Sequence, residues 1–244
     1  MIEIKLFKDC NLSGYTLIDA FPGAGLVGPM AGSYIIEKLG MEYIGYIDSD
    51  AFPPIAAIHG GMPMFPARLY KDDKYKIALV ISEFVIPSDV IYQLSRELLA
   101  FVRKNRIAMV ISLSGMPAQK QSTNAFIASP NAGLVDKAAK QGLKKIDEGV
   151  VAGVGAILMT NSEQFNVISA NILVEVNPQL MDPKYAEIAI EGLNKIIGTN
   201  IDLKALDEEA KVVEAKIKEM LKKMKESPEH YNNAAEATGP SMYA

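Results

Sequence analysis

The residues of this chain with the clearest enzyme-like spacing lie in one glycine-rich stretch. Gly23, Gly25 and Gly28 form a G-x-G-x-x-G pattern between an expected strand and an expected helix, and Asp48 follows Gly28 by 20 residues. In dinucleotide-binding proteins such a turn lets a pyrophosphate approach backbone N–H groups at a helix N-terminus, while an acidic residue at about this spacing binds the ribose. These four residues are therefore the candidates for cofactor binding.

Two prolines favour a different role for the same turn. Pro22 precedes the first glycine, and Pro29 follows the last one, inside the expected helix. Proline restricts the residue before it and removes a backbone donor from the helix. A tight turn in which the glycines permit close packing explains the pattern without a ligand. We favour packing over cofactor binding.

The remaining reactive side chains do not converge on one reaction. His59 has no second His, Cys or acidic cluster at ligand spacing, and Ser114 lacks the first glycine of a nucleophile elbow. Glu83 follows an expected core strand, where a carboxylate more often caps or pairs than catalyses. Gly153-Val154-Gly155 is a second glycine turn without the rest of a fingerprint. We therefore assign no catalytic residue and expect neither a metal nor a cofactor.

The elements that would position these residues alternate between strand and helix over residues 1–200. Strands are expected over Tyr15–Phe21, Glu42–Ile47, Tyr75–Ser82, Ile107–Leu113 and Val167–Val176, and helices over Leu26–Leu39, from a cap at Ser88 and Asp89, and from Asp182-Pro183 to just before Gly198. Continuous apolar strands are typical of parallel sheets covered on both faces. The pattern predicts a three-layer α/β sandwich with a mostly parallel sheet, in which residues 15–47 form a strand–helix–strand unit.

Composition excludes several classes of function. The 244 residues carry 25 Lys and Arg against 29 Asp and Glu, a formal charge of -4, which argues against a nucleic-acid partner. One cysteine and two histidines cannot support a disulfide framework or most zinc sites. The sequence has no signal peptide and no apolar run near 18 residues, so we expect a soluble cytoplasmic protein without a membrane partner.

A proline-rich apolar segment lies between two of the expected strands. Residues 51–67 include no side chain that is formally charged at neutral pH, and their four prolines and two glycines prevent a long regular element. Such a segment either folds over the core or is buried against a partner. We favour the partner.

The composition changes after residue 200. Apolar residues recur at steps of three and four, which predicts an amphipathic helix over residues 201–226; they are Leu203, Leu206, Ala210, Val213, Ile217, Met220 and Met224. This helix either docks on its own domain or pairs with another copy of the chain. Three heptads are the lower limit of a coiled-coil pattern, so both alternatives stay open.

The last residues read as a flexible tail with a distinctive end. Residues 227–244 have neither periodicity nor enough large apolar residues to fold. The chain ends in Met242-Tyr243-Ala244, a hydrophobic–tyrosine–any-residue terminus. A free carboxylate is a charge-assisted acceptor that a basic pocket can bind, and tyrosine adds a flat apolar body with one polar tip.

These features together resemble a known family. The stretch Phe21–Gly28, continuing through Tyr34–Leu39, resembles the signature of the second proteasome assembly chaperone and its archaeal homologues. Pro53-Pro54 and Pro66-Ala67-Arg68 are also similar, and Met242–Ala244 resembles the terminus of the archaeal PbaB-like members, which carry the HbYX motif. The resemblance covers most of residues 1–200.

The resemblance implies a nucleoside-phosphorylase-like domain used as a chaperone rather than an enzyme. It also implies a homo-oligomer, with a tetramer favoured, whose tails dock into pockets between proteasome core-particle α-subunits. Tyr243 and the Ala244 carboxylate would contact the pocket, with Met242 as the apolar anchor. The chain has no Walker motif, so we expect an ATP-independent proteasome assembly chaperone homologue and activator.

Two rival interpretations stay open at this point. The first is a nucleotide- or nucleoside-binding enzyme that uses Gly23–Gly28 with Asp48. The second is a scaffold whose terminal tripeptide is coincidental.

Overall fold

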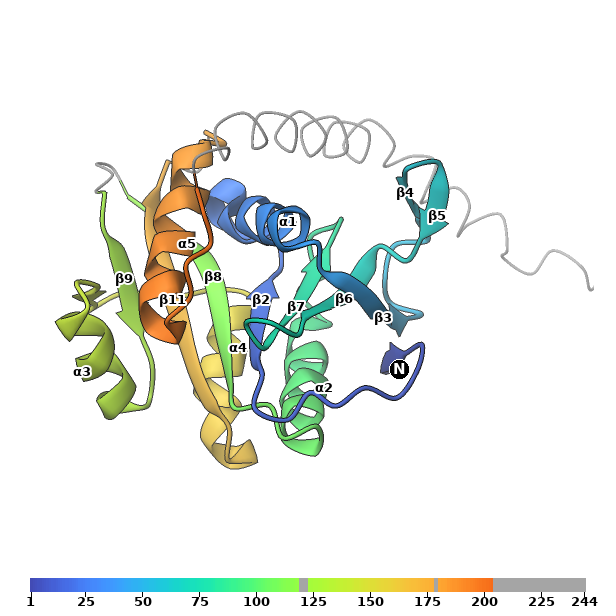
Figure 1. Ribbon diagram of the computed structural model, residues 1–244, viewed down its shortest axis with the longest axis horizontal. Helices are drawn as coiled ribbons and strands as arrows, with labels where there is room; N and C mark the ends of the chain where they lie inside the picture. The colour runs from blue at the N-terminus through green and yellow to red at the C-terminus, as the bar shows by residue number, and fades with distance from the viewer. Residues whose placement is uncertain (119–122, 178–179, 204–244) are drawn as a thin grey trace, which may run out of the picture.

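The computed structural model describes residues 1–118, 123–177 and 180–203, and its central feature is one large sheet (Figure 1). Across this part of the chain the sheet has nine strands. In spatial order they are β1 (Ile2–Leu6), β3 (Glu42–Ser49), β6 (Ala67–Asp72), β7 (Ile77–Ser82), β2 (Thr16–Ala20), β8 (Met109–Pro117), β11 (Ile168–Val176), β9 (Ala125–Ala128) and β10 (Lys144–Lys145). A separate hairpin consists of β4 (Ala57–His59) and β5 (Met62–Met64).

The centre of the sheet is parallel and its flanks are largely antiparallel. β7, β2, β8 and β11 pair in parallel, whereas β6, β3 and β1 pair antiparallel on one side and β9 pairs antiparallel with β11 on the other. All five residues of β2 and all six of β7 are buried, as expected for strands covered on both faces. The predicted α/β class is confirmed.

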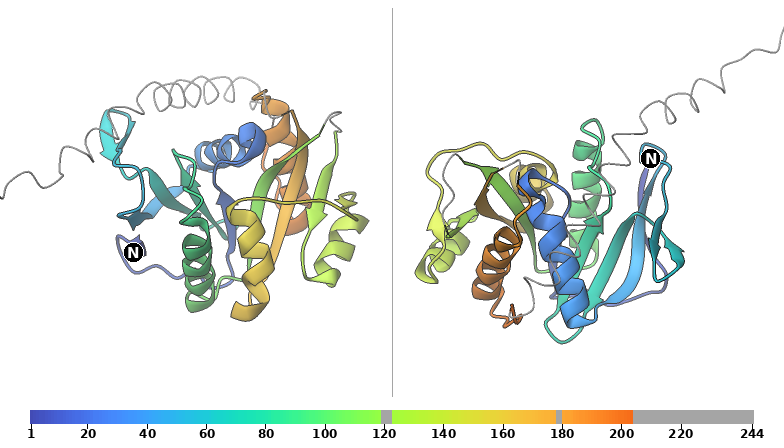
Figure 2. Two further views of the ribbon diagram at one scale, coloured as in Figure 1. Left: turned by 180° about the vertical axis from the view of Figure 1, so that it is seen from behind. Right: turned by 90° about the horizontal axis from the view of Figure 1, so that it is seen from above.

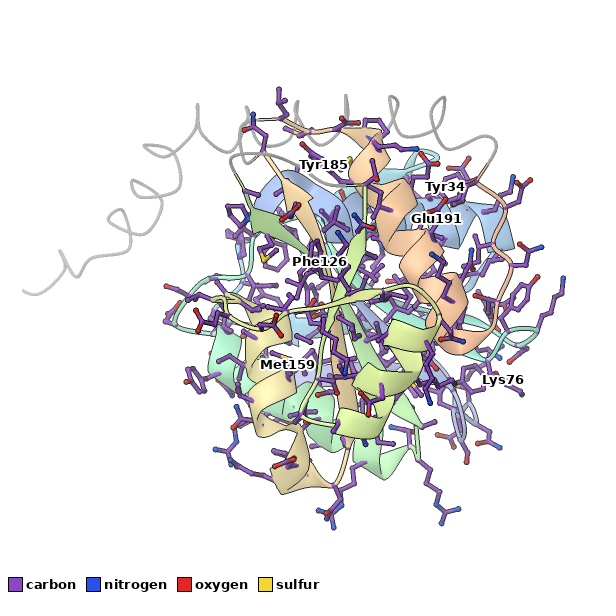
Figure 3. The ribbon with its side chains drawn as sticks, turned by 90° about the vertical axis from the view of Figure 1, so that its left-hand side faces the viewer. Tyr34, Lys76, Phe126, Met159, Tyr185 and Glu191 are labelled. Atoms are coloured by element: carbon purple, nitrogen blue, oxygen red, sulfur yellow. The ribbon has the colours of Figure 1, made fainter. Side chains whose placement is uncertain are left out.

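Helices cover the two faces of the parallel centre (Figures 2 and 3). α1 (Val27–Leu39) and α5 (Pro183–Ile197) lie on one face, and α2 (Ile91–Lys104) and α4 (Val154–Asn161) lie on the other. α3 (Ala132–Lys140) lies beside β9 and β10, and two short 3-10 turns, η1 (Ala24–Leu26) and η2 (Ser162–Phe165), adjoin α1 and α4. Each face has its own apolar cluster, with Ile18 in the first and Leu17 in the second.

The ends of α5 follow from its sequence. The Asp182 carboxylate accepts a hydrogen bond from the Lys184 N–H at 2.9 Å, Pro183 occupies the first turn, and Gly198 ends the helix at a φ of +70°. Side-chain caps satisfy N–H groups that have no acceptor within the helix, and glycine adopts the left-handed cap without strain. Both predicted boundaries of this helix are confirmed.

The predicted cap of α2 is wrong. The helix begins at Ile91, with Val90 at the cap position and no capping side chain, although its buried stripe of Leu94, Leu98 and Phe101 is as expected. The Val90 N–H donates to the Pro87 carbonyl at 3.0 Å. Ser88 and Asp89 lie within this turn, and neither side chain caps the first N–H groups of the helix.

The predicted strand–helix–strand unit is wrong at its second strand. β3 follows α1 but does not lie beside β2, because β6 and β7 separate the two strands. β3 instead pairs antiparallel with β1 and β6. Exposed and buried residues are mixed along β3, whereas every residue of β7 is buried. This difference is expected when β3 lies at the side of the sheet and β7 lies in its centre, covered by helices on both faces.

The described chain ends against α1 and α5. The side chain of Asn194 donates to the Ile201 carbonyl at 3.1 Å and accepts from the Ile201 N–H at 3.0 Å. The Tyr34 hydroxyl donates to the Asp202 carbonyl at 2.5 Å, and Leu203 packs on the first apolar cluster. The expected helix beyond Leu203 and the expected tail lie outside the described residues.

The described ranges contain neither a membrane-spanning helix nor a cluster of metal-ligating side chains. No helix there combines the length and the apolar character needed to cross a membrane. In the same ranges no three His, Cys, Asp or Glu side chains gather closely enough to hold a metal ion.

The capping contact of α5 predicts a measurable loss of stability. Replacing Asp182 by Ala removes the acceptor for the Lys184 N–H, so the free energy of unfolding should fall by about 1 kcal/mol in chemical denaturation. Asp89→Ala is the matched control, because Asp89 is exposed and caps nothing in α2, and it should leave stability unchanged. Equal losses in the two variants would contradict this account of the helix boundaries.

Candidate functional site

The two glycine turns that the sequence places far apart meet at the carboxyl ends of β2 and β8. The turn after β2 and the turn before α4 enclose a cavity of about 50 Å³, lined in part by Gly23, Ser114 and Gly153. Carboxyl ends of parallel strands are the usual position of ligand sites in α/β sheets. This cavity is therefore the first candidate site.

Close packing accounts for Gly25 and Gly28 of this turn. A Cβ atom added to Gly115 of β8 would lie 2.0 Å from the Ala24 carbonyl oxygen, and one added to Gly28 would lie 2.7 Å from the Phe21 carbonyl oxygen. Gly25 has a φ of +64°, and its added Cβ would lie 2.9 Å from the Val176 side chain. A Cβ added to Gly23 would meet no atom within 4 Å. The chain itself therefore packs against two of the three fingerprint glycines, which supports the packing interpretation for those two.

Pro29 fits this turn as well. It is the third residue of α1, within the first turn, where a backbone N–H has no acceptor inside the helix. Its missing donor therefore costs the helix nothing. The proline that counted against a nucleotide-binding helix in the sequence is compatible with an ordinary helix start.

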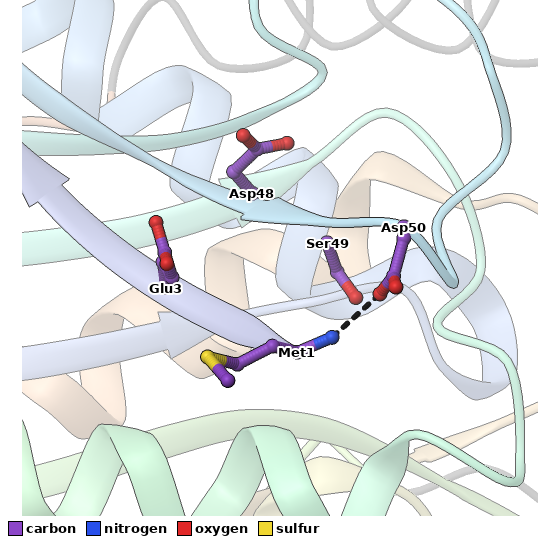
Figure 4. A pocket seen from close by; sticks show the side chains of 5 residues that line it. All are labelled: Met1, Glu3, Asp48, Ser49 and Asp50. Atoms are coloured by element: carbon purple, nitrogen blue, oxygen red, sulfur yellow. Dashed lines mark hydrogen bonds and ion pairs between the residues drawn. The ribbon is translucent and has the colours of Figure 1, made fainter.

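Asp48 lies elsewhere. β6 and β7 separate its strand from β2, a lateral distance of about 14 Å at the usual strand spacing. Figure 4 shows Asp48 beside a surface hollow with Glu3, and there the Met1 amino group pairs with the Asp50 carboxylate at 2.6 Å. The structure brings Gly23, Gly25 and Gly28 together but does not bring Asp48 to them.

A row of buried polar side chains lies beneath the second glycine turn. Asp19, Ser112 and Asn171 are lateral neighbours on β2, β8 and β11, and each is at most 4% exposed. Gly155, in the first turn of α4, lies over them, since its added Cβ would be 2.8 Å from both the Ser112 hydroxyl and the Asn171 amide nitrogen. Sequence reasoning missed this row. Its signal was a polar residue within the apolar run of each of three expected strands.

Asp19 is the titratable group of this row. Its Oδ2 accepts from the Ser112 hydroxyl at 2.7 Å, and its Oδ1 accepts from the Phe21 N–H at 3.1 Å. Burial raises the pKa of Asp19 to about 6, and the two hydrogen bonds offset part of that rise. The Asn171 amide is fully buried and has no hydrogen-bond partner among the described residues.

The buried row and the small cavity beside it are better suited to holding the two glycine turns together than to binding a substrate. Small-molecule pockets usually measure about 300–1,000 Å³, several times the cavity between the two turns. Ser114 lines the cavity, but His59, the histidine of the described residues, lies on the separate hairpin and not beside it. Asp19 instead ties β8 and the Phe21 backbone to β2.

The hairpin of β4 and β5 is the second candidate site. Glu83 accepts from both the His59 ring at 2.7 Å and the buried Arg68 guanidinium, so it pairs rather than standing ready for catalysis. Ile58 and Met62 are 64% and 67% exposed. The apolar segment thus divides: Phe52 packs edge-on against the core ring of Phe84, with ring centroids 4.9 Å apart, while the hairpin exposes apolar side chains. Burial of the hairpin against a partner stays a prediction.

The third candidate site cannot be placed. Met242, Tyr243 and Ala244 lie outside the described residues.

Gly115 gives a direct test of the packing interpretation. Gly115→Ala should lower the free energy of unfolding by about 3 kcal/mol, because the new methyl group would overlap the Ala24 carbonyl. Gly133→Ala in α3 is the matched control, since its Cβ would lie 3.4 Å from Asn131 Oδ1. This substitution should be neutral or slightly stabilising. If Gly115→Ala were as stable as the control in urea unfolding, the close contact would not exist.

Asp19 makes stability depend on pH with a defined sign. Its folded-state pKa of about 6 lies above the ordinary value of 3.8, so its contribution is fully present below 3.8 and is lost as pH rises through 6. A rise of about 2 in pKa corresponds to about 3 kcal/mol. Asp19→Asn, which cannot ionise, should therefore gain stability over the unmodified protein between pH 4 and pH 7.

The measurement is urea unfolding of both proteins at pH 5 and pH 8. The advantage of Asp19→Asn should be larger at pH 8, while the exposed control Asp89→Asn should show no such trend. A difference between Asp19→Asn and the unmodified protein that does not change with pH would exclude titration of Asp19 in this range.

Comparisons with known proteins place this geometry in a family. Residues 17–221 match the model of the PAC2 family. An uncharacterized protein of Methanocaldococcus jannaschii is 31% identical over 219 residues, which cover 88% of this chain and 90% of the relative.

Solved structures agree in fold. The crystal structure of Pyrococcus furiosus PbaA, described as an archaeal homolog of proteasome-assembly chaperone, superposes with a TM-score of 0.83 at 26% identity, over 93% of this chain and 99% of PbaA. Pyrococcus furiosus PbaB, described as an archaeal proteasome activator, gives a TM-score of 0.74 at 20% identity, over 92% and 98% of the two chains, and so shares the fold. Since the family model matches most of its length, this chain belongs to the PAC2 family.

Proposed function

We propose that this protein is an ATP-independent proteasome assembly chaperone homologue and activator. In this proposal Met242, Tyr243 and Ala244 dock into pockets between α-subunits of the proteasome core particle, in the cytoplasm. The observation that carries the proposal is the combination of a PAC2 body with a hydrophobic–tyrosine–any-residue terminus. PbaB, which shares the fold, is described as a proteasome activator, and PbaA as a homolog of proteasome-assembly chaperone.

The chemistry of the terminus suits this role. The Ala244 carboxylate would accept charge-assisted hydrogen bonds from a basic pocket, and the Tyr243 ring would fill an apolar slot with its hydroxyl at the wet end. Met242 would adapt to the rim, because its unbranched side chain fits irregular surfaces. Binding that favours an open α-ring would shift the gate toward opening without ATP.

Several copies would make a weak contact effective. Three residues at the end of a chain must offset the entropy of ordering that segment, so a single terminus binds weakly. Tails carried on one body raise the effective concentration at neighbouring pockets and increase avidity by about 10²–10⁴-fold. A homo-oligomer, which we propose to be a tetramer, would supply those tails.

The body supports a carrier role better than an enzymatic one. The buried row of Asp19, Ser112 and Asn171 is sealed beneath α4, and the cavity beside it measures only about 50 Å³. Asp48 lies on a distant strand. A nucleotide is larger than this cavity, so we prefer the carrier role to the nucleotide-binding alternative.

The terminus is tested with a latent archaeal proteasome core particle. The intact protein should stimulate peptide hydrolysis, whereas removal of Met242–Ala244 should abolish the stimulation. Tyr243→Ala should weaken binding by about 2 kcal/mol per tail, or roughly 30-fold. Tyr231→Ala is the matched control, since it removes a tyrosine from the same segment without altering the terminus. Stimulation that survives loss of the last three residues would refute docking by the tail.

The nucleotide alternative makes an opposing prediction. A ligand that binds only the folded state raises the unfolding temperature in proportion to RT ln(1 + [L]/Kd). Because the chain itself packs closely against Gly25 and Gly28, NAD, ATP and adenosine at millimolar concentration should cause no shift. A shift of several degrees that Gly25→Ala removes would instead favour a ligand site at this turn.

A further inference from the structure

The two edge strands of the sheet differ in length and charge, and so in how well they could pair with another strand. Within the described residues the sheet ends at β1 on one side and at β10 on the other. β10 has two residues, Lys144 and Lys145, both exposed. Its shortness and its like charges discourage pairing with another chain. β1 has five residues, and no described strand pairs with its outer edge.

The backbone groups that β1 leaves free can be identified from its register. Phe7 stands opposite Ile44 in the register of β1 and β3, and its N–H donates to the Ile44 carbonyl at 2.9 Å. Bonded residues alternate along an antiparallel strand, so Glu3 and Lys5 also bond to β3. The N–H and carbonyl groups of the even-numbered residues, Ile2, Ile4 and Leu6, therefore point away from β3, on a strand that also contacts α2.

The side chains of this strand are complementary to themselves. When two copies of residues 1–7 run antiparallel and are centred on Ile4, Ile4 faces the partner's Ile4 and Glu3 faces the partner's Lys5. Met1 then faces the partner's Phe7. The register thus places every charge opposite its counter-charge and every apolar side chain opposite another.

The exposure of these side chains fits the same register. Met1 and Phe7 are 80% and 53% exposed, although both are large and apolar. The side chains of Glu3 and Lys5 are 48% and 44% exposed, and they pair with each other at 2.6 Å on one face of the strand. In a two-fold pair of strands, Lys5 would lie between the Glu3 carboxylate of its own chain and that of the partner. The Glu3–Lys5 ion pair within each chain could therefore be kept.

We propose that a second copy of this chain pairs antiparallel along β1, centred on Ile4, so that the two sheets continue across the contact. The outward N–H and carbonyl groups of Ile2, Ile4 and Leu6 form the ladder. The Glu3–Lys5 pairs across the axis fix the register, because opposite charges stabilise cross-strand pairs and like charges destabilise them. Met1 and Phe7 enclose the two ends with a sulfur–aromatic contact.

The contact is independent of Met242–Ala244, although it would bring two tails onto one particle. Its failure therefore leaves docking by the terminus untouched, and the peptidase assay on Met242–Ala244 says nothing about β1. Pairing along β1 is tested by the mass of the particle, and docking by Met242–Ala244 is tested by peptide hydrolysis.

Charge exchange tests the register with its own control. Glu3→Lys and Lys5→Glu each place like charges opposite one another, and the double variant Glu3→Lys/Lys5→Glu restores the attraction with the signs reversed. Light scattering at tens of micromolar should give an even number of copies for the unmodified protein and for the double variant. Each single variant should have half that mass, with a dissociation constant of the β1 contact at least tenfold higher.

Amide hydrogen exchange provides a second readout within the same strand. In the unmodified protein the N–H groups of Ile2, Ile4 and Leu6 should be protected, and Lys5→Glu should expose them. The N–H groups of Glu3, residue 5 and Phe7 bond to β3 and should stay protected in both proteins, which shows that the variant is folded. A monomeric unmodified protein, equal masses for all four proteins, or unprotected even-numbered amides before mutation would overturn the proposal.

Discussion

The approach of the Ala24 carbonyl to Gly115 is the constraint on which the arrangement of this body depends. It holds η1 directly on β8, and α1 begins one residue after η1, so the contact sets where α1 crosses the sheet. Asp19 strengthens the same junction by binding Ser112 of β8 and the backbone of Phe21. Two of the glycines that resemble a nucleotide fingerprint, Gly25 and Gly28, are thus places where the chain packs closely on itself. A large side chain at either of them would separate the layers.

Sequence patterns predicted those parts of the fold that depend on residues close together in the chain. The ends of α5 follow from a capping carboxylate, a first-turn proline and a terminal glycine, all within one short segment. The buried centre follows from continuous apolar strands. The position of β3 could not be predicted in this way, because its neighbours come from chain segments before and after it. The buried row of Asp19, Ser112 and Asn171 was also missed, since only the lateral register of three strands brings these residues together.

Under the proposed function the body and the terminus have separate roles, so the fold alone is a poor guide to function. The body resembles PbaA and PbaB in fold over nearly its whole length, and the cavity between its two glycine turns is small. The residues that would recognise the partner are the last three, Met242, Tyr243 and Ala244, which lie outside the described part of the chain. Their types were readable from the sequence because a terminal carboxylate and a penultimate tyrosine need no fold to present them.

The attachment of the described chain end at Leu203 has a mechanical consequence. Asn194 holds Ile201 by two hydrogen bonds, and Tyr34 holds the Asp202 carbonyl. A pull on the chain beyond Leu203 is therefore transmitted to α5 and α1 together, and from them to the buried parallel strands beneath. The end of the described chain is thus coupled by three hydrogen bonds to both helices on one face of the sheet.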